Sequence, residues 1–562
     1  MLTRKLKIYG IVQGVGFRPF VKRLADELGI YGFIRNEGFG VVILLQGDDD
    51  TLSRFVKLLT QRKPSASTIE RIEIEEISTD EYFDKFSIVE SKVSAEIGIM
   101  PTDLAVCDKC ISEMYSPKNP RYLYPFINCT NCGPRFTIIR GLPYDRPMTT
   151  MSEFEMCEMC RIEYENPDSR RYHAQPIACP ECGPQYFTYP ENICDDLDVE
   201  KNIPEYAKPV AVAAKYIADG KIVAVEGIGG FHLVCDARND DAISRLRQWK
   251  RRRTKPFAIM VRDIKSAMKI AEISDDEKRL LQSPSAPILL VKIKENNLIS
   301  NLVAPELADV GVFLPYAPVH HLLFHFSAPE FLIATSGNRS DEPIAKDFQY
   351  AKENLDIADL ILWHNRGIHN RADDSVGFVL DDEFIAIRRA RGFVPQRYEL
   401  PRAGRKILAA GADMKGGVAF CDGKYIYPSQ YLGELSEILA QNFWRETVGK
   451  FLMWLKFKPD IVVSDSHPDY YSSRLAKEFA SKSGIPIVNI QHHRAHAWSV
   501  VAEHRISKPA IAVIYDGTGL GDDGKIWGGE FFLVNPATGE CKRIGHLREI
   551  VQPGGDSSAV HI

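Results

Sequence analysis

No run of apolar residues in this 562-residue sequence reaches the ~18–20 residues that a membrane-spanning helix needs. The N-terminal residues 1–7 also lack the long apolar core of a secretory signal. A basic excess is missing as well, because 70 Lys and Arg against 75 Asp and Glu give a net charge of −5. The sequence therefore predicts a cytoplasmic protein of about three to five domains, with neither a membrane nor a nucleic acid as its partner.

Residues 1–91 are predicted to form a small domain with the ferredoxin-like order strand, helix, strand, strand, helix, strand. The polar segment 90–96 is expected to be a linker. The expected strands are 5–12, 31–36, 40–46, 69–77 and 86–89, and the expected helices are 17–28 and 50–61.

The stretch GIVQGVGFR, residues 10–18, joins the first strand of this domain to its first helix. Glycines let backbone N–H groups converge before a helix N-terminus, and Arg18 adds a bidentate, permanently charged donor to this anion site. Asn36 ends the second strand, and we expect the first two strands to be neighbours, so that its amide orients a water for attack on phosphorus. The alternative is a tight structural turn with a surface arginine.

These residues resemble the acylphosphatase family, with 10–18 similar to its signature and 32–36 similar to its second motif. The resemblance implies an acylphosphatase-like domain in which Arg18 binds phosphate and Asn36 places the attacking water. The phosphate-binding set that it implies is Gln13, Gly14, Val15, Gly16, Phe17 and Arg18.

Residues 101–190 carry most of the cysteines in two repeats, the second lying 50 residues after the first. Each repeat has two C-x2-C pairs, whose tight turns can present both sulfurs to one Zn²⁺. Closed sites with four cysteines predict two structural zinc ions, whereas a disulfide framework or redox catalysis is disfavoured. The spacing leaves open whether each repeat binds its own zinc or the outer and the inner pairs combine. The cysteines are Cys107, Cys110, Cys129 and Cys132, then Cys157, Cys160, Cys179 and Cys182.

Four other cysteines fit no such pattern and are predicted to be packing residues. They are Cys194, Cys235, Cys421 and Cys541. Residues 190–204 are predicted to be a second, acidic linker.

Residues 205–395 alternate strands and helices and predict an α/β domain. A cation run at 249–258 and the segment ATSGNRS at 334–340 could together clamp a triphosphate, although a solvated helix end or a nucleic-acid patch is the alternative. The expected helices are 209–219 and 240–250, and the expected strands are 222–226, 257–261 and 288–291.

These motifs, together with residues 314–322 and 369–375, resemble those of YrdC-type domains. The resemblance implies that ATP, with Mg²⁺, adenylates a carbamate here. The nucleotide-binding residues that it implies are Lys250, Arg252, Lys255, Ser336, Asn338 and Arg371.

The last segment, residues 405–562, contains a candidate metal site. His492 and His496 would share one helix face, although an ordinary amphipathic helix is the alternative. Asp516 follows an apolar strand and could bind the same metal. Expected strands are 406–410, 461–464 and 510–515.

Strand–turn units at 410–415 and 516–521 are typical of the actin/hexokinase-like fold. The segment resembles the tRNA threonylcarbamoyl-transferase-type domain, which implies a divalent metal, zinc or iron, beside ATP at His492, His496 and Asp516. That domain has two lobes, and the second carries a further metal-ligating aspartate. Residues 405–562 are long enough for only the first lobe, so we expect a shortened domain, an incomplete metal site and impaired transfer.

The order of the four domains resembles the HypF family of carbamoyltransferases, which act in nickel–iron hydrogenase maturation. The resemblance implies hydrolysis of carbamoyl phosphate, adenylation of the carbamate with ATP, and transfer to the C-terminal cysteine of HypE for cyanide synthesis. One alternative is a tRNA-modifying carbamoyl or threonylcarbamoyl transferase, favoured by the YrdC-like motifs. The other is a zinc-dependent scaffold with vestigial phosphate motifs.

Overall fold

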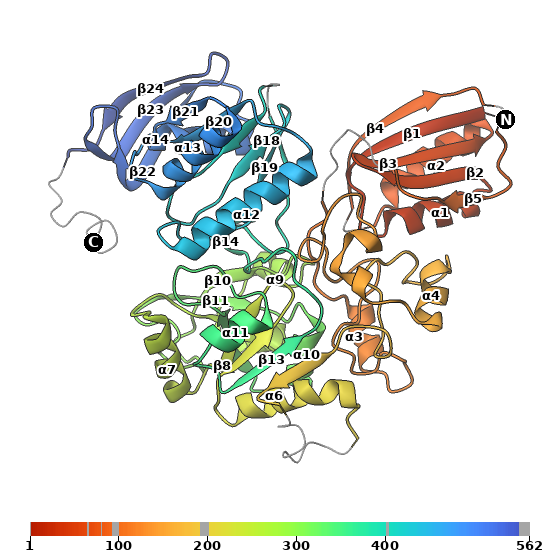
Figure 1. The fold of residues 1–562 in the computed structure, drawn as a ribbon, viewed down its shortest axis with the longest axis horizontal. Helices are drawn as coiled ribbons and strands as arrows, with labels where there is room; N and C mark the ends of the chain where they lie inside the picture. Colours follow the sequence, from red (N-terminus) through yellow and green to blue (C-terminus); the bar gives the residue numbers. More distant parts are fainter. Residues whose placement is uncertain are drawn as a thin grey trace. The chain divides into compact units, whose positions relative to one another are not determined.

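The computed structural model describes residues 2–64, 67–79, 81–92, 100–191, 202–400 and 404–549. The chain divides into two compact units, 1–395 and 396–562 (Figure 1). Among the described residues, no helix combines the length and the apolar character needed to cross a bilayer. Cys194 and parts of both predicted linkers lie outside the described residues.

The N-terminal domain has one sheet with strand order β4-β1-β3-β2-β5. Apolar side chains of the sheet and of both helices, among them Ile8, Val21 and Phe55, form its core. The ferredoxin-like prediction is confirmed. Its elements are β1 (Leu2–Ile11), α1 (Phe17–Glu27), β2 (Tyr31–Glu37), β3 (Gly40–Gly47), α2 (Asp49–Gln61), β4 (Thr68–Glu76) and β5 (Phe86–Ile88).

The expectation that the first and second strands are neighbours is wrong. β3 lies between β1 and β2 and pairs antiparallel with both. The crossover through α1 leaves one strand position open, and the short β2–β3 hairpin fills it. Asn36 on β2 therefore pairs with Val41 of β3, not with a residue of β1.

The cysteine-rich segment has short helices and long turns. Its last strand, β6, pairs with β13 and so joins the sheet of the following domain. The elements are α3 (Asp108–Met114), η1 (Arg146–Met148), η2 (Thr150–Glu153), α4 (Glu158–Glu165) and β6 (Tyr186–Tyr189).

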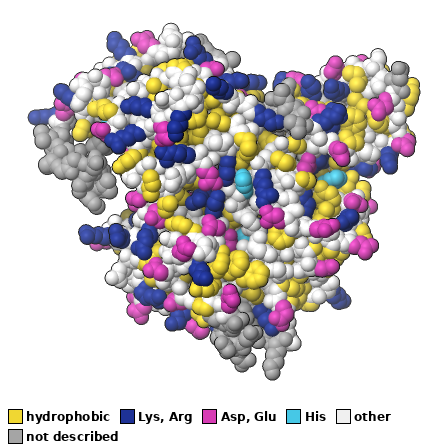
Figure 2. Space-filling model, viewed as in Figure 1, with side chains coloured by type: hydrophobic (Ala, Val, Ile, Leu, Met, Phe, Trp, Pro, Cys, Tyr) yellow, Lys and Arg dark blue, Asp and Glu magenta, His cyan; other side chains and the backbone are white. Residues whose placement is uncertain are grey.

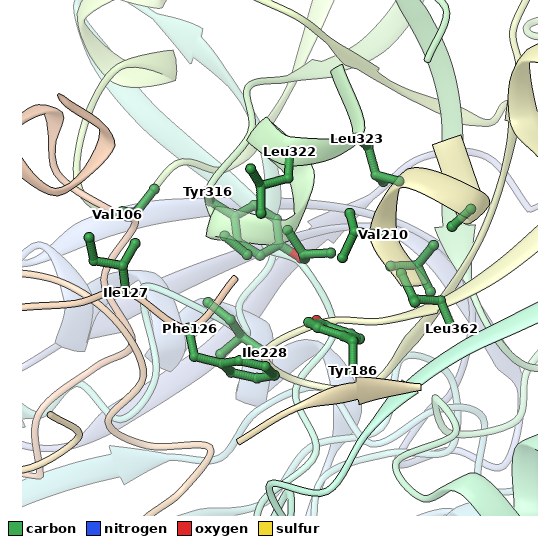
Figure 3. Close-up of a cluster of buried hydrophobic side chains, with 14 of the residues drawn as sticks. Val106, Phe126, Ile127, Tyr186, Val210, Ile228, Tyr316, Leu322, Leu323 and Leu362 are labelled. Atoms are coloured by element: carbon green, nitrogen blue, oxygen red, sulfur yellow. The ribbon is translucent and has the colours of Figure 1, made fainter. Parts of the chain in front are cut away.

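One hydrophobic core runs from the cysteine-rich segment into the α/β domain. Figure 3 shows Ile127 and Phe126 of the former beside Ile228, Tyr316 and Leu322 of the latter. Burying this surface on both sides is favourable at about 25 cal/mol per Å². The two parts of the chain therefore fold as one body.

The α/β domain contains a ten-stranded mixed sheet with order β15-β14-β10-β11-β9-β12-β8-β7-β13-β6. The predicted helices and strands occur within one residue of their expected bounds. Its strands are β7 (Val223–Glu226), β8 (Phe231–Asp236), β9 (Ala258–Val261), β10 (Ile288–Lys292), β11 (Asp309–Phe313), β12 (Phe331–Ser336), β13 (Leu360–His364), β14 (Val376–Leu380) and β15 (Glu383–Arg388). Its helices are η3 (Glu205–Ala207), α6 (Lys208–Ala218), α7 (Asp240–Lys250), α8 (Ile264–Ile270), α9 (Asp275–Leu281), α10 (Pro318–His325) and α11 (Phe348–Asn354).

The second unit has a six-stranded sheet, order β16-β19-β18-β17-β20-β21, and a three-stranded sheet, order β22-β23-β24. Its strands are β16 (Tyr398–Glu399), β17 (Ile407–Ala409), β18 (Ala419–Cys421), β19 (Tyr425–Pro428), β20 (Ile461–Asp465), β21 (Ile487–Ile490), β22 (Ala510–Leu520), β23 (Ile526–Asn535) and β24 (Glu540–His546). Its helices are α12 (Ile438–Leu455), α13 (Tyr471–Ser483) and α14 (His492–Glu503).

Three of the cysteines predicted to be packing residues lie in the described part of the chain. Cys235 belongs to the core of the α/β domain, and Cys421 is buried in the second unit. Cys541 packs against the apolar cluster of the three-stranded sheet. That prediction is confirmed for these three.

His364 makes the stability of the first unit depend on pH. Its ring packs edge-on against Phe126 and Tyr186, with centroids 5.3 Å away in both cases. Burial, and then the charge of Arg366, lower the pKa of His364 to about 3, against about 6.5 in an unfolded chain. Below pH 6.5 the unfolded chain binds a proton that the folded chain does not, so stability falls as pH drops through this window.

Each pH unit in this window is expected to cost about 1.4 kcal/mol from His364 alone. The free energy of unfolding, followed by urea titration between pH 7 and pH 5, should therefore fall less steeply in His364→Gln than in the parent chain. The slope is the readout, because the loss of aromatic packing lowers the variant's stability at every pH. Parallel slopes would contradict the prediction.

Candidate catalytic and metal sites

The glycine-rich turn between β1 and α1 has the shape of an anion cradle. Gly14 and Gly16 have φ of 69° and 75°, in the left-handed region that favours glycine. A Cβ on Gly16 would lie 2.7 Å from Asn131 Oδ1, so the turn also needs a residue without a side chain. Gly16 caps α1, and the first turn of that helix directs its N–H groups toward the cradle.

Arg18 lies in the first turn of α1 and is only 8% exposed. Its guanidinium lines a cavity together with Gly14 and Gly16. Arg18 Nη2 donates to Asp145 Oδ1 at 3.0 Å, and Asp145 belongs to the cysteine-rich segment. The ion pair with Asp145 therefore fixes the positive charge of Arg18 beside the cradle, where a phosphate is predicted to bind.

Asn36 is fully buried, and within the described residues neither its Oδ1 nor its Nδ2 has a hydrogen-bond partner. Buried amides are almost always paired, so this one is expected to hold a water or a substrate atom. Gln13 donates from Nε2 to the carbonyls of Glu37 and Gly40, at 2.7 and 2.8 Å. Gln13 thus ties the cradle to the β2–β3 turn that follows Asn36, and its contact with phosphate stays a prediction.

No sequence motif pointed to the residues that the cysteine-rich segment brings to this cradle. Arg135 donates from Nε to the Gly14 carbonyl at 2.6 Å and so fixes the orientation of the turn. Tyr144 and His173 line the same cavity. Comparison of the two cysteine repeats could have singled out His173, because the first repeat has a leucine at that place.

The two cysteine clusters have the geometry of tetrahedral zinc sites. Zinc with Zn–S bonds of about 2.3 Å has S···S edges of about 3.8 Å, far longer than a disulfide bond of about 2.05 Å. The S···S distances are 3.8, 3.7 and 3.7 Å for Cys107–Cys129, Cys129–Cys132 and Cys132–Cys110. They are 3.6, 3.7 and 3.7 Å for Cys157–Cys179, Cys179–Cys182 and Cys182–Cys160.

Each repeat forms its own cluster, which settles the pairing that the spacing had left open. Arg170 donates to Cys110 Sγ at 3.2 Å, and Arg121 donates to Cys160 Sγ at 3.3 Å. Such contacts suit thiolates, since four thiolates around Zn²⁺ carry a net charge of −2. The two clusters are therefore built for structural zinc.

Lys250 is the centre of the candidate nucleotide site. It ends α7, is 1% exposed, and donates from Nζ to the carbonyls of Ser336 and Asn338, both at 2.7 Å. Ser336 Oγ donates to Asn338 Oδ1 at 2.7 Å. Burial, and then the nearby charge of Arg252, hold the pKa of Lys250 well below its usual range. A bound polyphosphate would relieve that cost by supplying negative charge.

Of the remaining predicted nucleotide residues, Arg252 and Lys255 lie near enough to Lys250 for their charges to act on it. The charge of Lys255 lowers the pKa of Lys250 further. Arg371 donates to the carbonyl of Ile344, just beyond the segment that contains Asn338. The structure thus brings together the cation run and the Ser-Gly-Asn turn, which lie far apart in the sequence.

His492, His496 and Asp516 converge in the second unit, with one ligand atom of each within 4.8 Å of the others. His492 Nε2 lies 3.2 Å from Asp516 Oδ2 and 3.3 Å from His496 Nε2. β22 runs on to Leu520, beyond its predicted end, and its pairing is irregular between Tyr515 and Gly519, where Asp516 lies. This irregularity accompanies the turn of Asp516 toward α14.

Asp465 at the end of β20 orients the first histidine of this cluster. Its Oδ2 lies 2.6 Å from His492 Nδ1. A hydrogen bond at Nδ1 fixes the tautomer and leaves the Nε2 lone pair for a metal. The residues present therefore fit a divalent metal ion, and Asp465 was missed by the sequence analysis because it lies in no motif.

Comparison with curated proteins gives relatives over nearly the whole chain. The chain is 43% identical over 578 residues to carbamoyltransferase HypF2 of Cupriavidus necator, covering 99% of this chain and 70% of the relative. It is 43% identical over 562 residues to carbamoyltransferase HypF of Rhizobium leguminosarum bv. viciae, with the same coverage.

The chain belongs to the HypF family of carbamoyltransferases. Two solved HypF structures share its fold. One is full-length HypF in a phosphate- and nucleotide-bound form, with TM-score 0.91 and 40% identity over 97% of this chain and 70% of that one. The other is HypF of T. kodakarensis, with TM-score 0.89 and 41% identity over 100% of this chain and 71% of that one.

Family models match successive parts of the chain. Acylphosphatase matches residues 4–88, the HypF finger matches 106–139 and 156–189, and the Sua5/YciO/YrdC model, described as telomere recombination, matches 215–390. The HypF Kae1-like domain matches 402–503. The second subdomain of the Kae1-like carbamoyltransferase domain matches 512–562, the range that contains Asp516.

On the face drawn in Figure 2, basic and acidic side chains are interspersed and not gathered by sign. This distribution agrees with the small net charge of −5.

Proposed function

We propose that the first unit converts carbamoyl phosphate into a carbamoyl-adenylate and that the second unit transfers the carbamoyl group to a thiol. The thiol is the C-terminal cysteine of HypE, and the product serves the synthesis of the cyanide ligands of nickel–iron hydrogenase. The match to HypF carbamoyltransferases over nearly all of this chain and the three candidate sites support this sequence of steps.

In the first step, Arg18 and the cradle N–H groups hold the phosphoryl group of carbamoyl phosphate. Asn36 orients a water that attacks phosphorus, and the P–O bond to the carbamoyl oxygen breaks. The products are carbamate and inorganic phosphate. The fixed charge of Arg18 and the unpaired amide of Asn36 are suited to a transition state in which negative charge collects on the phosphoryl oxygens.

In the second step, the carbamate oxygen attacks the α-phosphorus of ATP, and pyrophosphate leaves. Lys250, Arg252 and Lys255 offer positive charge to the polyphosphate, and Ser336 and Asn338 orient it. Mg²⁺ bound with ATP supplies further charge neutralisation. In the third step, the HypE thiolate attacks the carbamoyl carbon and AMP leaves.

The third step belongs to the second unit. A divalent metal, zinc or iron, held by His492, His496 and Asp516 supplies Lewis-acid charge there. Asp465 keeps His492 in the tautomer that can bind it.

The observation that carries the proposal is the buried Arg18, paired with Asp145 beside the glycine cradle. It belongs to the same compact unit as the Lys250 cluster. Incorporation of labelled pyrophosphate into ATP tests both steps together. We expect exchange that requires carbamoyl phosphate. Exchange without carbamoyl phosphate, or phosphate release without any exchange, would contradict the coupling of the two sites.

Lys250→Met should abolish this exchange and leave phosphate release intact, because the two sites use different residues. Lys265→Met is the matched control, since Lys265 is exposed on the same domain. This variant is expected to catalyse pyrophosphate exchange at the rate of the parent chain.

A further inference from the structure

The cavity beside Arg18 is made by two parts of the chain. Gly14, Gly16 and Arg18 contribute from the acylphosphatase domain, whereas Thr130 and His173 contribute from the zinc-binding segment. Because the two walls line one cavity, a phosphate bound in the cradle lies within reach of Thr130 and His173. The second wall is therefore placed to contact the group that the phosphate carries.

The internal repeat shows that His173 is not required by the fold. Leu123 and His173 occupy equivalent places, 50 residues apart, and both have left-handed backbones, with φ of 53° and 51°. Their N–H groups make equivalent bonds, to Met114 O at 2.8 Å and to Tyr164 O at 2.9 Å. The same turn thus accepts a leucine, which is buried in the core of the first repeat, whereas the histidine of the second repeat lines the cavity.

The imidazole of His173 is held in place but has free hydrogen-bonding capacity. Its ring packs against Tyr172 and Tyr164, with centroids 4.6 and 4.9 Å away. Within the described part of the chain, neither ring nitrogen has a hydrogen-bond partner. Burial, and then the charge of Arg18, lower the pKa of His173 to about 4, so the ring is neutral at pH 7 and keeps a lone pair.

We propose that His173, together with Asp145, recognises the amino group of carbamoyl phosphate and makes the first site selective for carbamoyl over acetyl phosphate. This inference rests on the proposed hydrolysis of acyl phosphates at Arg18. Asp145 binds Arg18 through Oδ1 and leaves Oδ2 to accept a second hydrogen bond. The zinc-binding segment is then a specificity element of the first active site as well as a structural one.

The chemistry of the two substrates explains the selectivity. Carbamoyl and acetyl phosphate have nearly the same shape, but the first carries an NH₂ group where the second carries CH₃. His173 and Asp145 are half-buried acceptors. When an analogue without donors binds, such acceptors lose water without gaining a partner, and the site discriminates against that analogue.

The test compares kcat/KM for carbamoyl phosphate and for acetyl phosphate, measured by release of inorganic phosphate. In His173→Leu, which installs the residue of the first repeat, we expect the carbamoyl-to-acetyl ratio to fall by at least about tenfold. His173→Asn should retain part of the ratio, since its amide oxygen accepts and asparagine tolerates a left-handed backbone. His504→Leu is the matched control, because His504 is exposed in the second unit.

The outcomes separate recognition from folding and from the proposed function. Zinc content of two ions per chain would show that each variant is folded in this segment. An unchanged ratio, or equal losses for both substrates, would overturn the role of His173. A parent chain that hydrolyses neither substrate would contradict the proposed function, and equal affinities for both in a ³¹P NMR titration would then overturn recognition too.

Discussion

Arg18→Ala is expected to lower kcat/KM for carbamoyl phosphate hydrolysis by at least about a thousandfold. Arg18 is only 8% exposed, so its charge acts on phosphate with little screening by water. Its removal also leaves the Asp145 carboxylate, now 3.0 Å from Arg18 Nη2, without a partner beside an incoming anion. The variant thus loses the attraction between Arg18 and phosphate and gains a repulsion between Asp145 and phosphate.

A double-mutant cycle with Asp145→Asn can separate these two contributions. If repulsion contributes, the double variant should hydrolyse carbamoyl phosphate faster than Arg18→Ala alone. Arg23→Ala is the matched control, because Arg23 is exposed on the same helix. Ammonium carbamate, supplied directly, should restore pyrophosphate exchange to Arg18→Ala. Retention of a tenth or more of the parent hydrolysis would argue against Arg18 as the phosphate ligand.

Cys132→Ser is expected to remove one of the two zinc ions and most of the phosphate hydrolysis, although Arg18 lies in another domain. Structural zinc sites contribute apparent binding free energies of about 10–16 kcal/mol, which the surrounding turns need in order to fold. Arg135 links this cluster to the cradle, because its Nη1 donates to the Cys132 carbonyl at 2.9 Å and its Nε donates to the Gly14 carbonyl at 2.6 Å. Loss of the zinc therefore releases the cradle.

Zinc content by elemental analysis and phosphate release should fall together in this variant. Cys235→Ser is the control: Cys235 is buried in the α/β core outside both clusters, so both zinc ions should remain. Full hydrolysis by a chain with one zinc would show that the cradle does not depend on the first cluster.

Local patterns predicted most helices and strands. The helix expected at 240–250 is α7, and the strand expected at 31–36 is β2, one residue longer. Apolar periodicity reports which face of an element is buried, and that depends on nearby residues alone. The order of strands in a sheet depends on distant pairing, which explains why β3 was not expected between β1 and β2.

Side-chain chemistry was predictable in kind but not in arrangement. The C-x2-C pairs indicated zinc, and the histidines at 492 and 496 indicated a metal, because both patterns put ligands on one turn or one helix face. The sequence left open which C-x2-C pairs share a zinc ion, because the turn within each pair is the same for every combination of pairs. Asp465 was missed because it lies in no motif and meets His492 only through the contact between β20 and α14.

The sequence by itself determined the C-x2-C pairs of the two four-cysteine sites. It also predicted an anion-binding cradle, a nucleotide site at the cation run and a His-His-Asp metal cluster. The tertiary structure alone decided that the zinc-binding segment forms one wall of the Arg18 site. Arg135, Asp145 and His173 lie more than a hundred residues from the cradle and reach it through backbone turns of an irregular segment. No local periodicity records such a contact, because it arises from packing between residues that are far apart in the chain.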